Sequence, residues 1–169
     1  MEKKSIRRWA FAFFFVFFIA FYCSRHWFQL LLIQGDSMQP AYRHLQLVVL
    51  DKRGREYTYG DVVAFGCSGL HAVLVKRIAA VPGDSVQIRD GTLFVNHRKS
   101  RIYPEEGIFS YAGEASAEIV LSGREYFVIG DNVGVSRDSR YEEVGLVEGH
   151  CILGYVLKVG ECFRKVLNR

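Results

Sequence analysis

The sequence predicts a mainly β domain behind one N-terminal transmembrane helix. Three observations lead to this fold class. An apolar run free of charged residues lies near the N-terminus, short apolar runs of strand length follow it, and no convincing amphipathic helix appears after residue 26. A chain of 169 residues, half of them apolar, has room for one packed domain and an anchor.

The apolar run from Trp9 to Cys23 is expected to form a membrane anchor over residues 9–26. Fifteen helical residues extend about 22 Å, less than the roughly 30 Å of a hydrocarbon core, so basic residues at both flanks must snorkel. A secretory signal peptide has the same basic and apolar regions. However, no small-x-small cleavage site follows the run, which favours an uncleaved anchor.

More basic residues precede this apolar run than follow it. Lys3, Lys4, Arg7 and Arg8 precede it, whereas Arg25 alone follows closely. The positive-inside rule therefore predicts a cytoplasmic basic N-terminus at residues 1–8 and an extracytoplasmic domain at 27–169.

The β domain is predicted from alternating or continuous apolar runs bounded by turn signals. Asp90-Gly91 is a strong two-residue hairpin signal within residues 86–95. Residues 97–122, with Pro104 and several glycines, are expected to be an irregular excursion from the sheet. The other expected strands are 45–50, 61–65, 126–129 and 152–157.

Charge and cysteine spacing exclude several classes of partner. The net charge of +4 is spread along the chain apart from the N-terminal cluster, so no nucleic-acid partner is expected. The four cysteines form no C-x-x-C and have no histidine at metal spacing, so neither a metal nor another cofactor is expected. Outside the cytoplasm Cys151 and Cys162 can form a disulfide, but free thiols there and at Cys67 are an equal alternative.

Ser37, in the stretch "QGDSMQP" at 34–40, raises the question of a nucleophile, which would need a base within hydrogen-bond reach. A chymotrypsin-like order fails because the only upstream histidine is His26, at the membrane edge. The D-x-x-H of GDSL esterases and the G-x-S-x-G elbow are both absent.

Lys76 is the remaining candidate base, because it lies within the apolar stretch 72–81. Burial disfavours the ammonium form, and a neutral amine can act as a general base. The alternative is a strand residue that points to solvent, since alternation places only one of Lys76 and Arg77 inside.

Four sequence boxes in order behind an anchor resemble those of bacterial type I signal peptidases. They are "GDSMQP", "GDVVAF" at 60–65, "LVKRIAAVPGD" at 74–84 and "GDNVGVSRDSR" at 130–140, and the resemblance covers residues 30 to about 157. It implies an antiparallel β-sheet domain, with Ser37 as nucleophile and Lys76 as general base.

The resemblance also implies supporting residues. Ser136 would hydrogen-bond the lysine amine, and Met38 would line the pocket for the side chain before the scissile bond. Gly35 stands where some members have a serine that donates to the oxyanion, so the Ser37 backbone N–H would carry more of that role. Ion pairs would brace the site, formed by Arg77, Asp131, Asp138 and Arg140. Ala41 and Val133 depart from the usual threonine and arginine, which puts the bracing of the nearby loops in doubt.

The implied function is an endopeptidase, a monomer, that removes signal peptides from exported preproteins at the outer face of the cytoplasmic membrane. Its partners would be preprotein signal peptides and the lipid bilayer. A peptidase dedicated to pilins or conjugative-transfer proteins and a non-catalytic assembly factor are the alternatives. LexA-like repressors share the serine–lysine pair, but they are soluble and bind DNA, which the anchor argues against.

Overall fold

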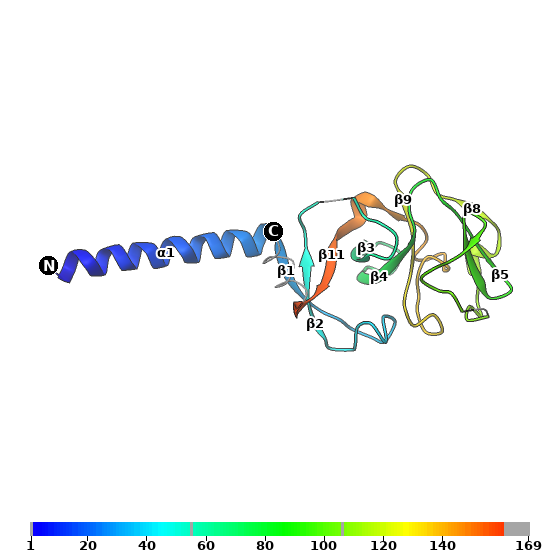
Figure 1. Ribbon diagram of the computed structural model, residues 1–169, viewed down its shortest axis with the longest axis horizontal. Helices are drawn as coiled ribbons and strands as arrows, with labels where there is room; N and C mark the ends of the chain where they lie inside the picture. Colours follow the sequence, from blue (N-terminus) through cyan, green and yellow to red (C-terminus); the bar gives the residue numbers. More distant parts are fainter. Residues whose placement is uncertain (1, 55, 106, 161–169) are drawn as a thin grey trace.

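One long helix is followed by a β domain in the computed structural model, which describes residues 2–54, 56–105 and 107–160, without the side chains of residues 2–6, 23 and 24. Helix α1 (Glu2–His26) projects from one end of the β domain (Figure 1). The mainly β fold class predicted from the sequence is confirmed.

Two antiparallel sheets make up the β domain. The larger sheet has seven strands in the order β1-β2-β11-β3-β4-β9-β10, and the smaller has four in the order β7-β6-β5-β8. In Figure 1, β1, β2 and β11 lie beside α1, whereas β5 and β8 lie at the far end. The larger sheet comprises β1 (Phe28–Leu32), β2 (Leu47–Asp51), β3 (Val62–Cys67), β4 (Ala72–Ala80), β9 (Glu125–Ile129), β10 (Val147–Glu148) and β11 (Ile152–Lys158); the smaller comprises β5 (Ser85–Arg89), β6 (Thr92–Val95), β7 (Arg98–Lys99) and β8 (Ile119–Val120).

Strand β4 is paired along only part of one side. It pairs with β3 from Ala72 to Arg77, but its pairing with β9 runs only from Arg77 to Ala80, with a register shift between Ile78 and Ala80. Among the described residues, the 72–76 half of β4 therefore has a strand neighbour on one side only. Its other edge leaves backbone groups able to pair with an added chain.

The hydrophobic core is divided by the larger sheet. Val75 packs with Met38 and Val62 in one cluster, whereas Leu74 and Ile78 pack in another with Val63. Neighbouring residues of β4 thus face opposite sides of the sheet, as strand geometry requires. A third cluster fills the space between the smaller sheet and β9.

The predicted strands are found with small shifts. The first begins at Leu47 instead of residue 45, because Leu45 adopts φ 59° in the preceding turn. Asp90 and Gly91 both have positive φ, as a tight hairpin between β5 and β6 requires. The 97–122 segment is largely irregular, but it contains β7, β8 and a short 3₁₀ helix, Gly113–Ser116.

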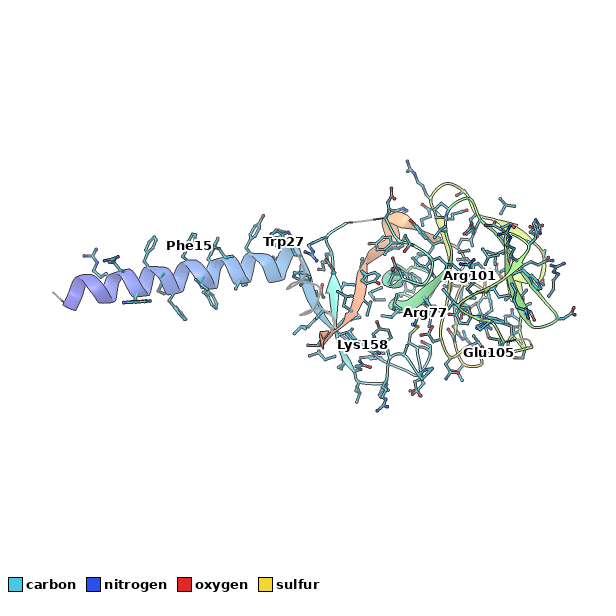
Figure 2. All side chains as sticks on the ribbon, in the orientation of Figure 1. Phe15, Trp27, Arg77, Arg101, Glu105 and Lys158 are labelled. Atoms are coloured by element: carbon cyan, nitrogen blue, oxygen red, sulfur yellow. The ribbon has the colours of Figure 1, made fainter. Side chains whose placement is uncertain are left out.

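Helix α1 covers the expected anchor at residues 9–26, and its side chains from Trp9 to Tyr22 are exposed (Figure 2). Over the described part of the chain, however, no helix is both long and apolar enough to cross a membrane. The predicted transmembrane helix is therefore not found. Arg8 and Arg25 leave sixteen uncharged positions between them, about 24 Å of helix against a core of about 30 Å.

The cysteines of the β domain are free where the structure describes them. Cys67 is buried and Cys151 is half-buried, and neither forms a disulfide. Cys162, the other half of the predicted alternative, lies outside the described residues.

Candidate active site

Ser37 lies in a loop that connects β1 to β2 and is closed at its base. Ile33 N donates to Gln46 O and Leu45 N donates to Ile33 O, at 3.0 and 2.8 Å. Met38, which is 1 % exposed, anchors the turn in the core beside Tyr42. Ser37 itself is left at the surface of this turn, next to the half-paired edge of β4.

Gly35 has a backbone conformation that the sequence did not indicate. Its φ of 90° is one that residues with a side chain rarely adopt, although a Cβ there would meet no atom within 4 Å. Its N–H donates to His44 Nδ1 at 2.9 Å. Backbone geometry rather than lack of space therefore favours glycine at this position.

Lys76 reaches Ser37 from the middle of β4. Its Nζ lies 2.7 Å from Ser37 Oγ, and the residue is only 3 % exposed. The alternative of a solvent-facing lysine is therefore wrong, and Arg77 takes the opposite side of the strand. Burial lowers the pKa of Lys76 from 10.5 to about 8, while nearby Asp138 opposes this shift and Arg140 adds to it.

Asp138 and Arg140 form an ion pair beneath the site. This pair is almost fully excluded from water. The Arg140 Nε donates to Asp138 Oδ1 at 2.8 Å, and the two side chains are 1 % and 0 % exposed. Arg140 also donates to the carbonyl oxygens of Val133 and Ser136, and Asp138 accepts from Gly130 N–H. The pair thereby fixes the 130–140 loop through backbone atoms. Because the contact at position 133 uses the backbone carbonyl oxygen, a valine there can make it.

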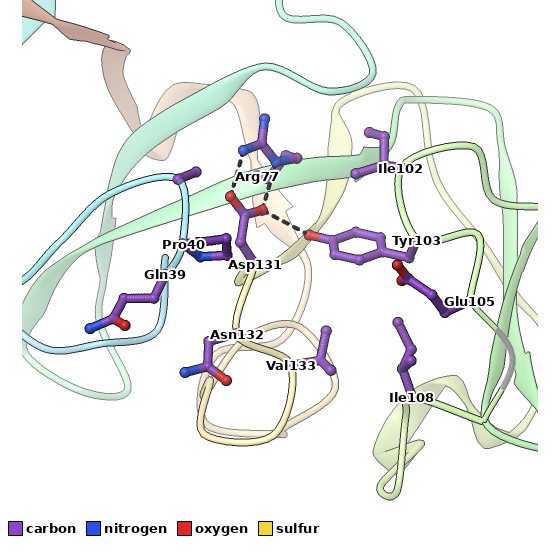
Figure 3. Close-up of a pocket in the computed structure, with 11 residues that line it drawn as sticks. Gln39, Pro40, Arg77, Ile102, Tyr103, Glu105, Ile108, Asp131, Asn132 and Val133 are labelled. Carbon is purple, nitrogen blue, oxygen red and sulfur yellow. Dashed lines mark hydrogen bonds and ion pairs between the residues drawn. The ribbon is translucent and has the colours of Figure 1, made fainter.

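Arg77 and Asp131 form a second ion pair. The Arg77 Nε donates to Asp131 Oδ1 at 2.6 Å, and Arg77 also donates to Gly60 O at 2.8 Å. Buried Tyr103 adds a hydrogen bond to the same carboxylate, as Figure 3 shows. Burial, followed by the charge of Asp131, raises the pKa of the Tyr103 hydroxyl well above its usual value. The four charged residues singled out in the sequence therefore lie in two ion pairs.

Asn132 joins the last box to the serine turn, a role that sequence reasoning missed. Its backbone N–H donates to Ser37 O at 3.0 Å, and its side-chain amide donates to Asp36 O at 3.3 Å. A Cβ on neighbouring Gly130 would lie 2.5 Å from Ser37 O. The asparagine of the Gly-Asp-Asn sequence is the signal for this contact, whereas the sequence analysis assigns a role only to the aspartate.

Ser136 does not make the hydrogen bond expected of it. The residue is 1 % exposed, and within the described residues its Oγ has no hydrogen-bond partner. Its N–H closes a turn on Asn132 O, and its hydroxyl lies where a side chain on Gly130 would collide with it. The hydroxyl therefore faces the Gly130 backbone instead of the Lys76 amine.

A narrow slot opens beside Ser37 and Lys76. It has a volume of about 220 Å³ and is lined by residues 31–34, 37–38 and 73–76. The end of β1 and the half-paired edge of β4 thus form its two walls, with the Ser37–Lys76 contact at one end. An extended peptide in this slot can hydrogen-bond to the free edge of β4, in the manner of β-strand addition.

Comparison with known proteins gives consistent matches. The family model "Signal peptidase, peptidase S26" matches residues 6–159. Signal peptidase I S of Bacillus subtilis (strain 168) is 28 % identical over 150 residues, which cover 82 % of this chain and 80 % of the relative. Signal peptidase I of Bacillus licheniformis is 29 % identical over 164 residues, covering 90 % and 87 %.

A solved structure of a signal peptidase I from Enterococcus faecalis V583 is 24 % identical, with a TM-score of 0.48, and covers 61 % of this chain and 98 % of that one. The family model, by contrast, spans nearly the whole described chain and includes all four boxes. This protein therefore belongs to the signal peptidase family, peptidase S26.

Proposed function

We propose that this protein is a serine endopeptidase that removes N-terminal signal peptides from exported preproteins, with Ser37 as nucleophile and Lys76 as general base. The observation that carries the proposal is the 2.7 Å contact between Lys76 Nζ and Ser37 Oγ, made by a lysine that is only 3 % exposed. A serine hydroxyl needs such a base, and burial supplies an amine with a pKa of about 8, near enough to neutrality to act as one.

The first half of the reaction forms an acyl-enzyme. Neutral Lys76 takes the hydroxyl proton as Ser37 Oγ attacks the scissile carbonyl carbon, and the Ser37 backbone N–H donates to the resulting oxyanion. The Lys76 ammonium then gives its proton to the leaving amine, which departs as the new N-terminus of the mature protein. The signal peptide stays bound to Ser37 as an ester.

The second half of the reaction regenerates the serine. Lys76, again neutral, takes a proton from a water molecule that attacks the ester carbonyl, and the ammonium returns this proton to Ser37 Oγ. The signal peptide leaves with a free carboxylate. This sequence needs no group beyond those of the chain and water, so no cofactor is proposed.

The slot suggests which sequences are cleaved. Its volume of about 220 Å³ is below the usual range for ligand pockets, and Met38 fills the space beside the nucleophile. We therefore propose that the residues before the scissile bond bind in the slot as an extended strand, and that small side chains are preferred at the first and third positions before the cut.

The exposed apolar residues near the slot suggest where the enzyme works. Leu30, Leu32 and Val73 are 63 %, 46 % and 51 % exposed, and Trp27 lies where α1 meets the domain (Figure 2). Together with the aromatic surface of α1 they form an apolar region too extended for a freely soluble protein. We propose that α1 and these residues hold the domain, as a monomer, against the outer face of the cytoplasmic membrane, where preproteins emerge.

Incubation of the full chain in detergent with a panel of preproteins tests this function. New N-termini, located by sequencing, should follow small-x-small sequences. The variants Ser37→Ala, Lys76→Ala and Lys76→Arg should each abolish cleavage, because guanidinium does not deprotonate in a protein. The double variant should be no worse than either single variant. Cleavage by Lys76→Arg at the wild-type rate would contradict the assignment of the base.

A further inference from the structure

A second hollow borders the residues that follow Ser37 and Met38 in the chain (Figure 3). Its volume is about 790 Å³, and one wall is formed by Gln39, Pro40 and Ala41, which directly follow the serine and Met38. The opposite wall is formed by Ile102, Tyr103, Glu105 and Ile108, and Asn132 and Val133 also line the hollow. This larger hollow is called the distal groove below.

The distal groove continues the slot along two stretches of chain. Residues 73–76 line the slot and Arg77 lines the groove. Likewise residues 37–38 line the slot and residues 39–41 line the groove. In both stretches the chain passes from the slot to the groove within two residues of Ser37 or Lys76.

Among the described residues that line the distal groove, Glu105 is the one charged side chain outside an ion pair. Arg77 and Asp131 neutralise each other across hydrogen bonds of 2.6 Å and 2.5 Å. Glu105 is exposed, and among the described residues it forms no ion pair or hydrogen bond. In Figure 3 its carboxylate points from the 102–108 segment into the hollow, beside Tyr103. The groove therefore carries a net negative charge on the wall that contains Tyr103 and Glu105.

We propose that the distal groove binds the first residues of the mature protein, those just after the scissile bond, and that Glu105 favours a lysine or arginine among them. This inference rests on the proposed function, since it takes the slot as the binding place of the residues before the cut. The apolar side chains of Ile102, Ile108 and Val133 provide contact for the neighbouring residues of the peptide. The groove thus makes cleavage depend on sequence beyond the signal peptide.

A charge exchange tests the role of Glu105. One preprotein that the wild-type chain cleaves is prepared with lysine, glutamine or glutamate at the second, third or fourth position after the cut. At the most sensitive position, kcat/KM should be about two- to five-fold higher with lysine than with glutamate at low salt, the size expected of an exposed charge pair. Glu105→Gln should remove this preference, and Glu105→Lys should reverse it.

The matched control is Glu118→Gln. Glu118 is also exposed, but it lies just before β8, and its carboxylate is 3.5 Å from His97 Nε2. This variant should keep the wild-type preference. A preference that is unchanged in Glu105→Lys, or lost equally in Glu118→Gln, would overturn the role of Glu105.

Photocrosslinking tests the placement without turnover. The Ser37→Ala chain is mixed with the same preprotein carrying benzoylphenylalanine at the third position after the cut. Crosslinks should map to residues 39–41, 102–108 or 131–133. Crosslinks elsewhere, while the wild-type chain cleaves the preprotein, overturn the groove assignment and leave the proposed function intact. Absence of cleavage by the wild-type chain overturns the proposed function, and this inference falls with it.

Discussion

Lys76 Nζ contacts Ser37 Oγ at 2.7 Å from a position that is only 3 % exposed. The two residues are 39 positions apart, and the contact depends on a turn that carries the serine to the half-paired edge of β4. Burial of the amine is what gives it the properties of a base. Two measurable consequences follow from that burial, one for the rate and one for stability.

The first prediction concerns the pH dependence of cleavage. Because the pKa of Lys76 is lowered to about 8, roughly one amine in ten is neutral at pH 7, against about one in 3,000 at the unperturbed value of 10.5. The rate should therefore rise about ten-fold per pH unit below pH 8 and level off above it. Measurement of kcat/KM from pH 5 to 10 checks this. A rate independent of pH between 6 and 8 would contradict a lysine base.

The second prediction concerns stability. The pKa of Lys76 is about 8 in the folded chain and 10.5 unfolded, so unfolding takes up a proton between these pH values, and the lysine disfavours folding below them. Lys76→Met should abolish cleavage yet raise the free energy of unfolding by up to about 3 kcal/mol at pH 7, at about 1.4 kcal/mol per pKa unit.

This gain should shrink as the pH rises from 8 through 10.5, because wild-type Lys76 becomes neutral in both states only above that range. Urea unfolding at pH 7 and pH 10 measures it. Lys52→Met, at an exposed position after β2, is the matched control and should show no such pH-dependent gain. A Lys76→Met chain that is less stable than wild type at pH 7 would argue against a costly buried amine.

The sequence predicted β2, β3, β5, β6, β9 and β11 because each of these strands has a local signal, whereas β1 and the two-residue strands β7, β8 and β10 were not among the expected strands. Apolar runs and the Asp90-Gly91 hairpin are readable from neighbouring residues, and β5 and β6 pair as that turn requires. Likewise, the resemblance to a family brought Ser37 and Lys76 together as a pair. The structure adds their contact and the burial of the lysine.

Loop geometry could not be predicted in the same way, because it depends on contacts between segments far apart in the chain. The hydroxyl of Ser136 is directed by a turn on Asn132, and Asn132 in turn holds the Ser37 backbone. The family resemblance indicates only that Gly35 replaces a serine that donates to the oxyanion in some members. Its φ of 90° means that a serine here would be strained. No periodicity or composition reports such angles.

The third prediction is topological and rests on the lysine and arginine asymmetry around α1. In cells stripped of their wall, protease added outside should digest the domain after about residue 27, while a cytoplasmic marker protein stays intact. Alkaline carbonate washing of the membranes should leave the chain in the pellet, given the exposed aromatic surface of α1. Protection of the domain from external protease would overturn the orientation.

The fourth prediction uses the two charges that act on Lys76 from below. The Asp138 carboxylate raises the pKa of Lys76 and the Arg140 guanidinium lowers it. Asp138→Asn should therefore move the midpoint of the pH–rate profile to lower pH, and Arg140→Met should move it to higher pH. Each change leaves one buried charge unpaired, so each should also cost about 3–5 kcal/mol of stability.

The control for these variants is Glu143→Gln, which breaks the more exposed pair of Glu143 with Arg137. It should change stability by less than about 1 kcal/mol and leave the midpoint in place. If Asp138→Asn and Arg140→Met shift the midpoint in the same direction, the shift reflects altered packing and not the two charges.

The last prediction compares two buried serines, Ser136 and Ser139, each 1 % exposed. Ser139 Oγ accepts a hydrogen bond from Val128 N at 3.1 Å, whereas Ser136 Oγ has no partner among the described residues. Removal of a partner from a buried N–H costs about 1–3 kcal/mol, and removal of an unsatisfied hydroxyl costs nothing or stabilises. Ser139→Ala should therefore lower the free energy of unfolding by that amount, and Ser136→Ala should leave it unchanged or raise it slightly. Because the Ser136 hydroxyl makes no hydrogen bond to Lys76, Ser136→Ala should also keep the cleavage rate within about three-fold and the pH midpoint in place. A loss of ten-fold or more with a shifted midpoint would instead mean that the Ser136 hydroxyl turns to the Lys76 amine once substrate is bound.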